Sequence, residues 1–70
     1  MPKHTKRERD ESMARVRSLR AATGLSAEAF ARIADVSTAS IRSWEYGERI
    51  PSEPMLAKLQ AAAKQMEAQA

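Results

Sequence analysis

The stretch from Ser26 to Trp44 constrains the fold most, because it predicts two short helices joined by a tight turn. A serine hydroxyl can accept hydrogen bonds from the free N–H groups of a first helical turn, so Ser26 and Ser37 suit the two starts. Between them stands Asp35, one of the few residue types besides glycine that tolerate a left-handed conformation. The stretch therefore predicts two helices and the corner between them.

The apolar residues of this stretch recur at helical spacing, which indicates one buried side. They are Phe30, Ala31 and Ala34 in the first helix, and Ile41 and Trp44 in the second. Ala31 is small enough to let the second helix approach closely. We expect this second helix over residues 38–46, with an outward face made of Thr38, Ala39, Arg42 and Ser43.

Two further helices are predicted on either side. The first is expected from about residue 11 to 22, capped by Asp10 or Ser12 and ended by Gly24. Its apolar stripe is Met13, Val16 and Leu19. The last is expected from Glu53, after a capping Ser52, toward the C-terminus. Its stripe is Leu56, Leu59, Ala63 and Met66.

As a set, these features resemble the phage-repressor (Xre/Cro-type) helix-turn-helix family, from about Val16 to Leu59. The matching residues are Arg20, Gly24, Leu25, Ser26, Phe30, Ala31, Val36, Ser37, Ile41, Trp44, Glu45, Gly47 and Pro51. The resemblance implies an all-α fold, a compact lambda-repressor-like bundle of four or five helices that binds double-stranded DNA. It also implies that helix 38–46 enters the major groove with its N-terminal end leading.

The resemblance assigns roles to individual residues. Base contacts fall to the outward residues Thr38, Ala39, Arg42 and Ser43. Of these, Arg42 alone has a long side chain, which can bind guanine through two hydrogen bonds or hold a phosphate. Phosphate contacts fall to Ser26, Ser37, Ser40, Tyr46 and Arg49. Arg20 and Glu45 are implied to form a structural ion pair.

Charge divides the 70-residue chain unevenly. Residues 1–20 carry a surplus of four positive charges, whereas residues 21–70 carry a deficit of one. We expect a flexible basic arm over residues 1–9, a helix-turn-helix domain over 10–60 and an extension of the last helix over 61–70. Two readings of the arm remain open, a solvated tail and a set of phosphate contacts. The arm's cationic residues are Lys3, Lys6, Arg7 and Arg9.

Two positions depart from the family pattern. The helix after Ser26 opens with Ala27 where the family often has a phosphate-contacting glutamine. The turn has Asp35 where glycine is frequent in the family, and this adds negative charge near the groove unless the carboxylate is held against the cap of helix 38–46. We therefore expect modest specificity from one subunit, and a homodimer at least on DNA.

Enzymatic chemistry finds almost no support in the sequence. The chain has no cysteine, and its one histidine, His4, lies in the expected arm without neighbouring ligands. We expect no cofactor, no metal site and no membrane association, and a cytoplasmic, nucleoid-associated protein.

The leading hypothesis is a sequence-specific transcriptional regulator, a repressor of phage, prophage or toxin–antitoxin type. Two alternatives remain open. One is an architectural DNA binder such as an excision factor. The other is a protein-interaction module that binds its partner through the last helix. Two readings of the end of this helix remain open: a seam of Ala63 and Met66 for a partner or a second copy, and a frayed, solvated terminus.

Overall fold

The Ser26–Trp44 stretch forms the two helices α2 (Ala27–Ala34) and α3 (Thr38–Glu45) in the computed structural model, which describes residues 4–69. The hydroxyl oxygen of Ser26 accepts from the backbone N–H of Ala29 at 3.2 Å, and that of Ser37 accepts from Ser40 at 3.0 Å. These bonds satisfy first-turn N–H groups that a helix cannot pair internally. Both predicted caps are confirmed.

The corner between α2 and α3 depends on a left-handed residue. Asp35 has φ 59° and ψ 48°, as the sequence predicts. This conformation turns the chain sharply, so that the backbone N–H of Val36 donates to the carbonyl of Ala31 at 3.0 Å. The turn thereby closes the open carbonyl end of α2.

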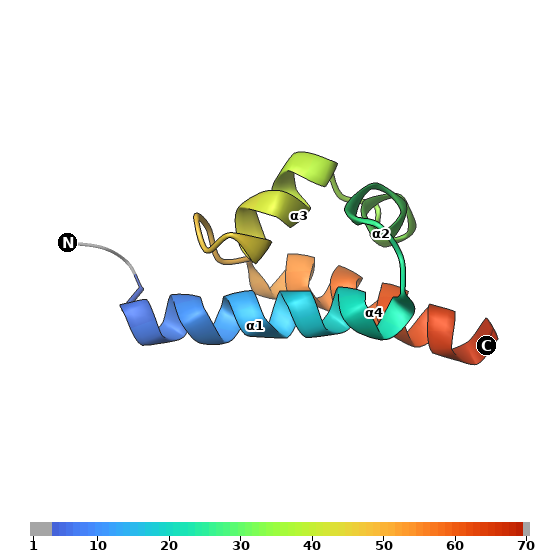
Figure 1. Cartoon of the computed structure of the whole chain (residues 1–70), viewed down its shortest axis with the longest axis horizontal. Coiled ribbons are helices and arrows are strands. Elements are labelled where there is room, and N and C mark those ends of the chain that lie inside the picture. The colour runs from blue at the N-terminus through green and yellow to red at the C-terminus, as the bar shows by residue number, and fades with distance from the viewer. Residues whose placement is uncertain (1–3, 70) are drawn as a thin grey trace.

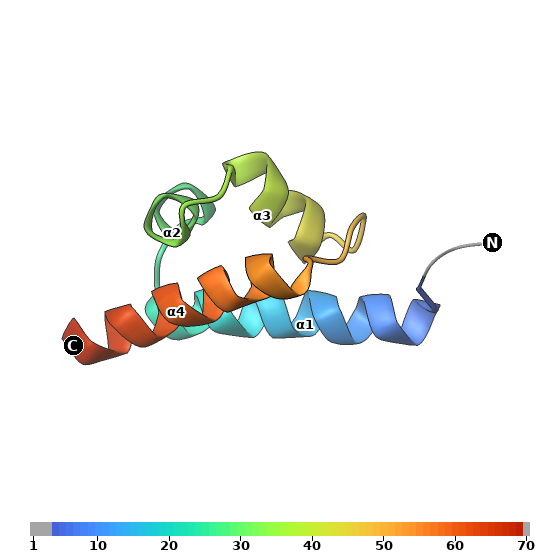
Figure 2. The ribbon, with the colours of Figure 1, turned by 180° about the vertical axis from the view of Figure 1, so that it is seen from behind.

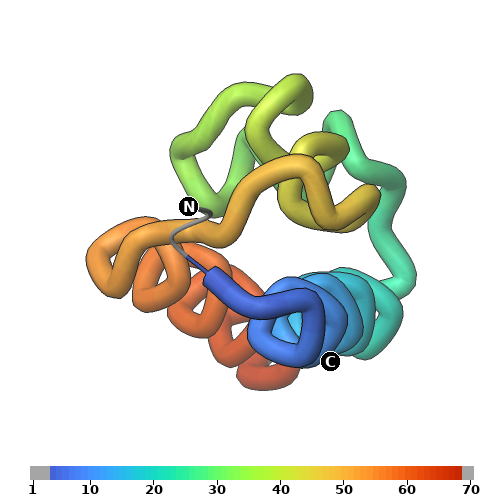
Figure 3. Tube along the Cα trace, turned by 90° about the vertical axis from the view of Figure 1, so that its left-hand side faces the viewer, coloured from blue at the N-terminus to red at the C-terminus, as the bar shows by residue number. Residues whose placement is uncertain are grey.

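The flanking helices α1 (Lys6–Thr23) and α4 (Glu53–Gln69) form a second layer. They lie side by side and run in the same direction, and α2 and α3 lie together over one side of the pair (Figures 1 and 2). The view along α1 in Figure 3 separates the two layers. The expected all-α bundle is confirmed, with four helices among residues 4–69.

The core lies between the two layers. Four side chains, one from each helix, are fully buried: Val16, Phe30, Ile41 and Leu59. Small residues line the same cluster and let the helices approach, and Trp44 closes it with 6% of its surface exposed. Burial of each large apolar side chain contributes roughly 1.5–3 kcal/mol, so each helix is held chiefly by its packing.

Helix α1 begins five residues before the expected start at residue 11, so the predicted caps Asp10 and Ser12 are wrong. Thr5 is the N-cap: its hydroxyl accepts from the N–H of Glu8 at 3.1 Å, and the Glu8 carboxylate accepts from the N–H of Thr5 at 3.3 Å. This reciprocal capping box starts the helix at residues that are all polar or charged, before its first apolar side chains. Within the expected flexible arm, residues 6–9 are therefore helical.

The connection from α3 to α4 is tightly packed. Gly47 has φ 77°, a conformation that is strained for a residue with a Cβ, and a Cβ there would also lie 2.9 Å from Sδ of the flexible Met13 side chain, which would have to shift. Pro51 is buried, and the hydroxyl of Ser52 accepts from the N–H of Met55 at 3.4 Å.

Helix α4 continues unbroken to Gln69. Ala63 is nearly covered at 9% exposure, and Ala62, outside the expected stripe, is buried at 2%. The seam expected on Ala63 and Met66 thus has little free surface from Ala63, while Met66 is half-buried. No helix within residues 4–69 combines the length and the apolar character needed to cross a membrane.

Candidate nucleic-acid interface

The C-terminal end of α3 is fastened to α1 by two arginines. Arg20 binds both carboxylate oxygens of Glu45, from Nε at 2.5 Å and from Nη2 at 2.9 Å, and donates to the carbonyl of Leu25 at 3.1 Å. Arg17 donates from Nε to the backbone carbonyl of Glu45 at 2.8 Å. The pair implied by the family resemblance is therefore present, and Arg17 adds a contact that the sequence does not predict.

The Arg20–Glu45 pair is shielded on its acidic side. The Glu45 side chain is 8% exposed and that of Arg20 is 32% exposed. The hydrogen bond from the Arg20 guanidinium to this carboxylate raises the pKa of Arg20, against a smaller opposing effect of burial. Each of the three guanidinium nitrogens of Arg20 donates a hydrogen bond within the protein, so this cation is a structural anchor of α3.

The opposite, N-terminal end of α3 points away from the α1/α4 layer (Figure 1). Its outward residues follow the expected face only in part: Ala39 and Arg42 are exposed, whereas Thr38 and Ser43 are half-buried. The exposed end of a short helix that is anchored at its other end can enter the major groove, which is wide enough to admit a helix.

Arg42 is paired with a residue of α2. Its Nη2 donates to Oε1 of Glu28 at 2.6 Å, and the two side chains are 53% and 57% exposed. No sequence pattern assigns a role to Glu28, because the two residues stand on different helices. Only the packing angle of α2 against α3 brings them together.

The three candidate phosphate-binding serines differ in what their hydroxyls already bind. Ser26 and Ser37 both accept at a helix start, and Ser37 also donates to Oγ of Ser40 at 2.8 Å. The hydroxyl proton of Ser37 is thus engaged inside the protein. Ser26 is exposed and uses its hydroxyl as an acceptor, which leaves its proton available to a phosphate oxygen.

The remaining candidates gather at the end of the molecule that holds the α3–α4 loop. Tyr46 is 64% exposed, and Arg49 is exposed. The start of α1 lies at the same end (Figure 1), and it carries Lys6, Arg7 and Arg9 as exposed residues. Arg7 is paired with Glu11 at 3.2 Å. Lys3 lies outside the described residues.

Asp35 is not held against the cap of α3. Its carboxylate is 97% exposed and lies 4.0 Å from Nζ of Lys58, which also donates to its backbone carbonyl at 3.4 Å. An ion pair with this exposure is strongly screened by water. The negative charge of Asp35 therefore stays at the corner between α2 and α3.

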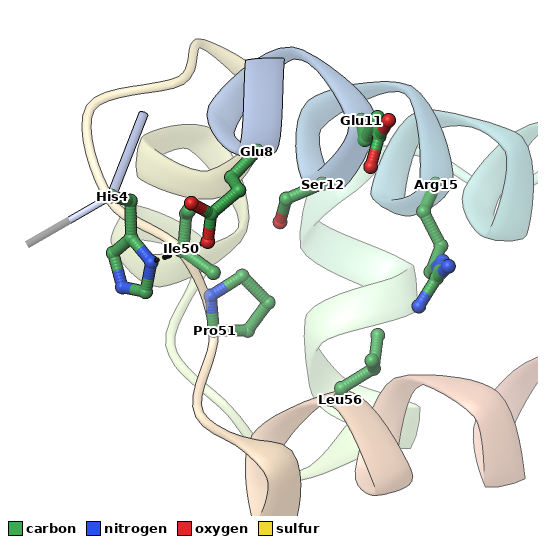
Figure 4. Close-up of a pocket in the computed structure, with 8 residues that line it drawn as sticks. All are labelled: His4, Glu8, Glu11, Ser12, Arg15, Ile50, Pro51 and Leu56. Carbon is green, nitrogen blue, oxygen red and sulfur yellow. Dashed lines mark hydrogen bonds and ion pairs between the residues drawn. The ribbon is translucent and has the colours of Figure 1, made fainter. Parts of the chain in front are cut away.

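A pocket of about 230 Å³ separates the start of α1 from the α3–α4 loop and α4. In Figure 4, His4 and Glu8 point toward each other at one end of the pocket, with Nδ1 and Oε2 3.3 Å apart, and the apolar lining comes from Ile50, Pro51 and Leu56. No group of His, Asp or Glu within residues 4–69 has the placement of a metal site.

Comparison with known proteins gives one family match. A family model described as helix-turn-helix, of the Xre/Cro type, matches residues 16–63. This range runs from the middle of α1 through most of α4 and contains the Arg20–Glu45 anchor and all of α2 and α3. No curated protein and no solved structure matches the chain significantly.

Proposed function

Because the chain belongs to the helix-turn-helix family of the Xre/Cro type, with the lambda-repressor-like fold and the DNA binding that this family implies, we propose that it is a sequence-specific transcriptional repressor. Its setting would be a phage, a prophage or a toxin–antitoxin pair. The observation that carries the proposal is α3 itself, anchored at one end through Glu45 and presenting Arg42 at its outer face.

In the proposed complex, α3 lies in the major groove with its N-terminal end leading. Arg42 reads a guanine, since it alone among the base-facing residues can span two acceptors. Ala39 and Thr38 offer methyl contact to thymine, and Ser43 adds a hydrogen bond of low selectivity.

Phosphate contacts on either side of the groove would fix the position of α3. The exposed Ser26 lies at the start of α2, while Tyr46 and Arg49 lie beyond the end of α3. Lys6 and Arg9, on the helical start of α1, would extend this second group. Such contacts hold the register without reading sequence, and they make the affinity depend on salt.

We further propose that the protein binds as a homodimer. An eight-residue α3 with one long base-facing side chain reads few base pairs. Two copies on half-sites about one DNA turn apart, roughly 34 Å, would double the sequence that is read.

Selection of sites from a random duplex pool at near-physiological salt tests the proposal. We expect a symmetric, paired motif, and a motif altered at one position in each half when Arg42→Ala is selected. Arg32→Ala is the matched control, because Arg32 is an exposed arginine of the last turn of α2 and is not assigned to a base. It should leave the motif unchanged.

The second candidate function is architectural DNA binding, and the short side chains at positions 38, 39 and 43 favour it. It predicts binding without an enriched motif. Loss of that binding on removal of residues 1–9 would support this candidate. Absence of DNA binding altogether would contradict both candidates and favour a protein-interaction module, whose partner would bind α4.

A further inference from the structure

The Glu28–Arg42 pair places a carboxylate beside the residue proposed to read DNA. The two side chains come from different helices, and each is more than half exposed, so the pair lies at the surface of the candidate interface. The contact uses Nη2 of Arg42. Within residues 4–69, no hydrogen bond engages its Nε or Nη1, so donors remain for a second partner.

A phosphate and a guanine edge compete for Arg42 on unequal terms. The acceptors of guanine are neutral, so a guanidinium can bind them while Glu28 remains attached. A phosphate is an anion, and to reach Arg42 it must either displace the carboxylate or lie beside it. Like charges at such short range repel, and the repulsion is only partly screened at physiological salt.

We infer that Glu28 is a specificity-determining residue that acts through Arg42. It neutralises the arginine toward phosphates and leaves its donors available to a base. The inference rests on the proposed DNA-binding function. A carboxylate that repelled phosphates by its own charge would act without Arg42, whereas the proposed effect of Glu28 requires Arg42.

The surroundings of the pair are consistent with this role. The other carboxylate at the corner, Asp35, lies against Lys58 rather than Arg42. Glu45, the acid at the end of α3, is buried against Arg20. Glu28 is therefore the carboxylate bound to the Arg42 guanidinium among the described residues.

The test compares Glu28→Gln with wild type on two duplexes of equal length, one carrying the selected motif and one without it. Glu67→Gln is the matched control, because it removes the same charge from an exposed residue near the end of α4, far along the chain from α2 and α3. Each affinity is measured over a range of salt concentrations.

We expect Glu28→Gln to tighten binding to the duplex without the motif by roughly three- to tenfold, and binding to the motif by less. On the non-specific duplex, the slope of log affinity against log salt should steepen by about 0.9, the value for one additional neutralised phosphate. Glu67→Gln should leave the ratio of the two affinities unchanged. In an Arg42→Ala background, Glu28→Gln should have no such effect.

A brace between α2 and α3 would behave differently. If Glu28→Gln weakens binding to both duplexes equally, and the thermal midpoint falls, the pair is structural and the inference is overturned. An unchanged salt slope, or an effect that persists without Arg42, also overturns it. If wild type binds neither duplex, the proposed function itself fails and the inference falls with it.

Discussion

Arg17 and Glu45 are joined through the backbone: Nε of the arginine donates to the carbonyl oxygen of Glu45 at 2.8 Å. This carbonyl ends α3, where helical carbonyls lack internal partners and carry partial negative charge. Arg20 binds the carboxylate of the same residue. One residue thus connects α3 to α1 through both its main chain and its side chain.

Glu45→Ala should destabilise the domain by about 2–3 kcal/mol, because it leaves Arg20 without its buried acceptor. We expect less than the loss of a fully buried pair, since Arg20 remains one-third exposed. Urea unfolding measures the effect. Glu48→Ala, an exposed glutamate three residues further on, is the control and should cost less than about 0.5 kcal/mol. Equal stabilities of the two variants would contradict the anchoring role.

Asp35→Ala should unfold at lower urea than Asp35→Gly. Both variants remove the same carboxylate, but only alanine retains a Cβ in a conformation with φ 59°. The left-handed region costs a residue with a Cβ about 1 kcal/mol, and glycine avoids that cost. A difference in this direction would show that the backbone, rather than the contact with Lys58, sets the requirement at position 35.

Thr5→Ala should fray the start of α1 without unfolding the domain. The substitution removes the hydroxyl that accepts from the N–H of Glu8. Amide hydrogen exchange should accelerate at residues 8–10 and stay slow at Val16, whose side chain is fully buried. Uniform acceleration along α1 would mean that the first turns and the core open together.

The same helix start should respond to acid. The pKa of the Glu8 carboxyl lies below its ordinary 4.5. The main cause is the hydrogen bond that the backbone N–H of Thr5 donates to this carboxylate, and the hydrogen bond with the His4 side chain has the next largest effect. A lowered pKa in the folded state stabilises the helix start above pH 4.5, and this contribution is lost as the pH falls through the lowered value. Helicity at residues 6–9 should therefore decline below about pH 4.5 in wild type and remain less sensitive to pH in Glu8→Gln.

The sequence predicted α2 and α3 closely because their signals are local. Ser26 and Ser37 mark the starts, Asp35 marks the corner, and Phe30 and Ile41 mark the buried sides. Each signal acts within one helical turn and does not depend on distant parts of the chain.

The start of α1 and the partner of Arg42 were missed for two different reasons. The first turns of α1 have no apolar periodicity, so a prediction based on buried stripes begins too late, although Thr5 and Glu8 have the spacing of a capping box. Glu28 lies 14 residues from Arg42, and no sequence pattern reports the angle between two packed helices. That contact could only come from the fold.

Contact between DNA and the exposed face of α3 can be followed residue by residue in solution. Isotopically labelled protein is titrated with a selected duplex, and its backbone amide resonances are recorded. We expect the largest shifts at residues 37–43, with smaller ones at Ser26 and at Tyr46–Arg49. Shifts concentrated on residues 60–67 of α4, with α3 unperturbed, would contradict DNA contact through α3.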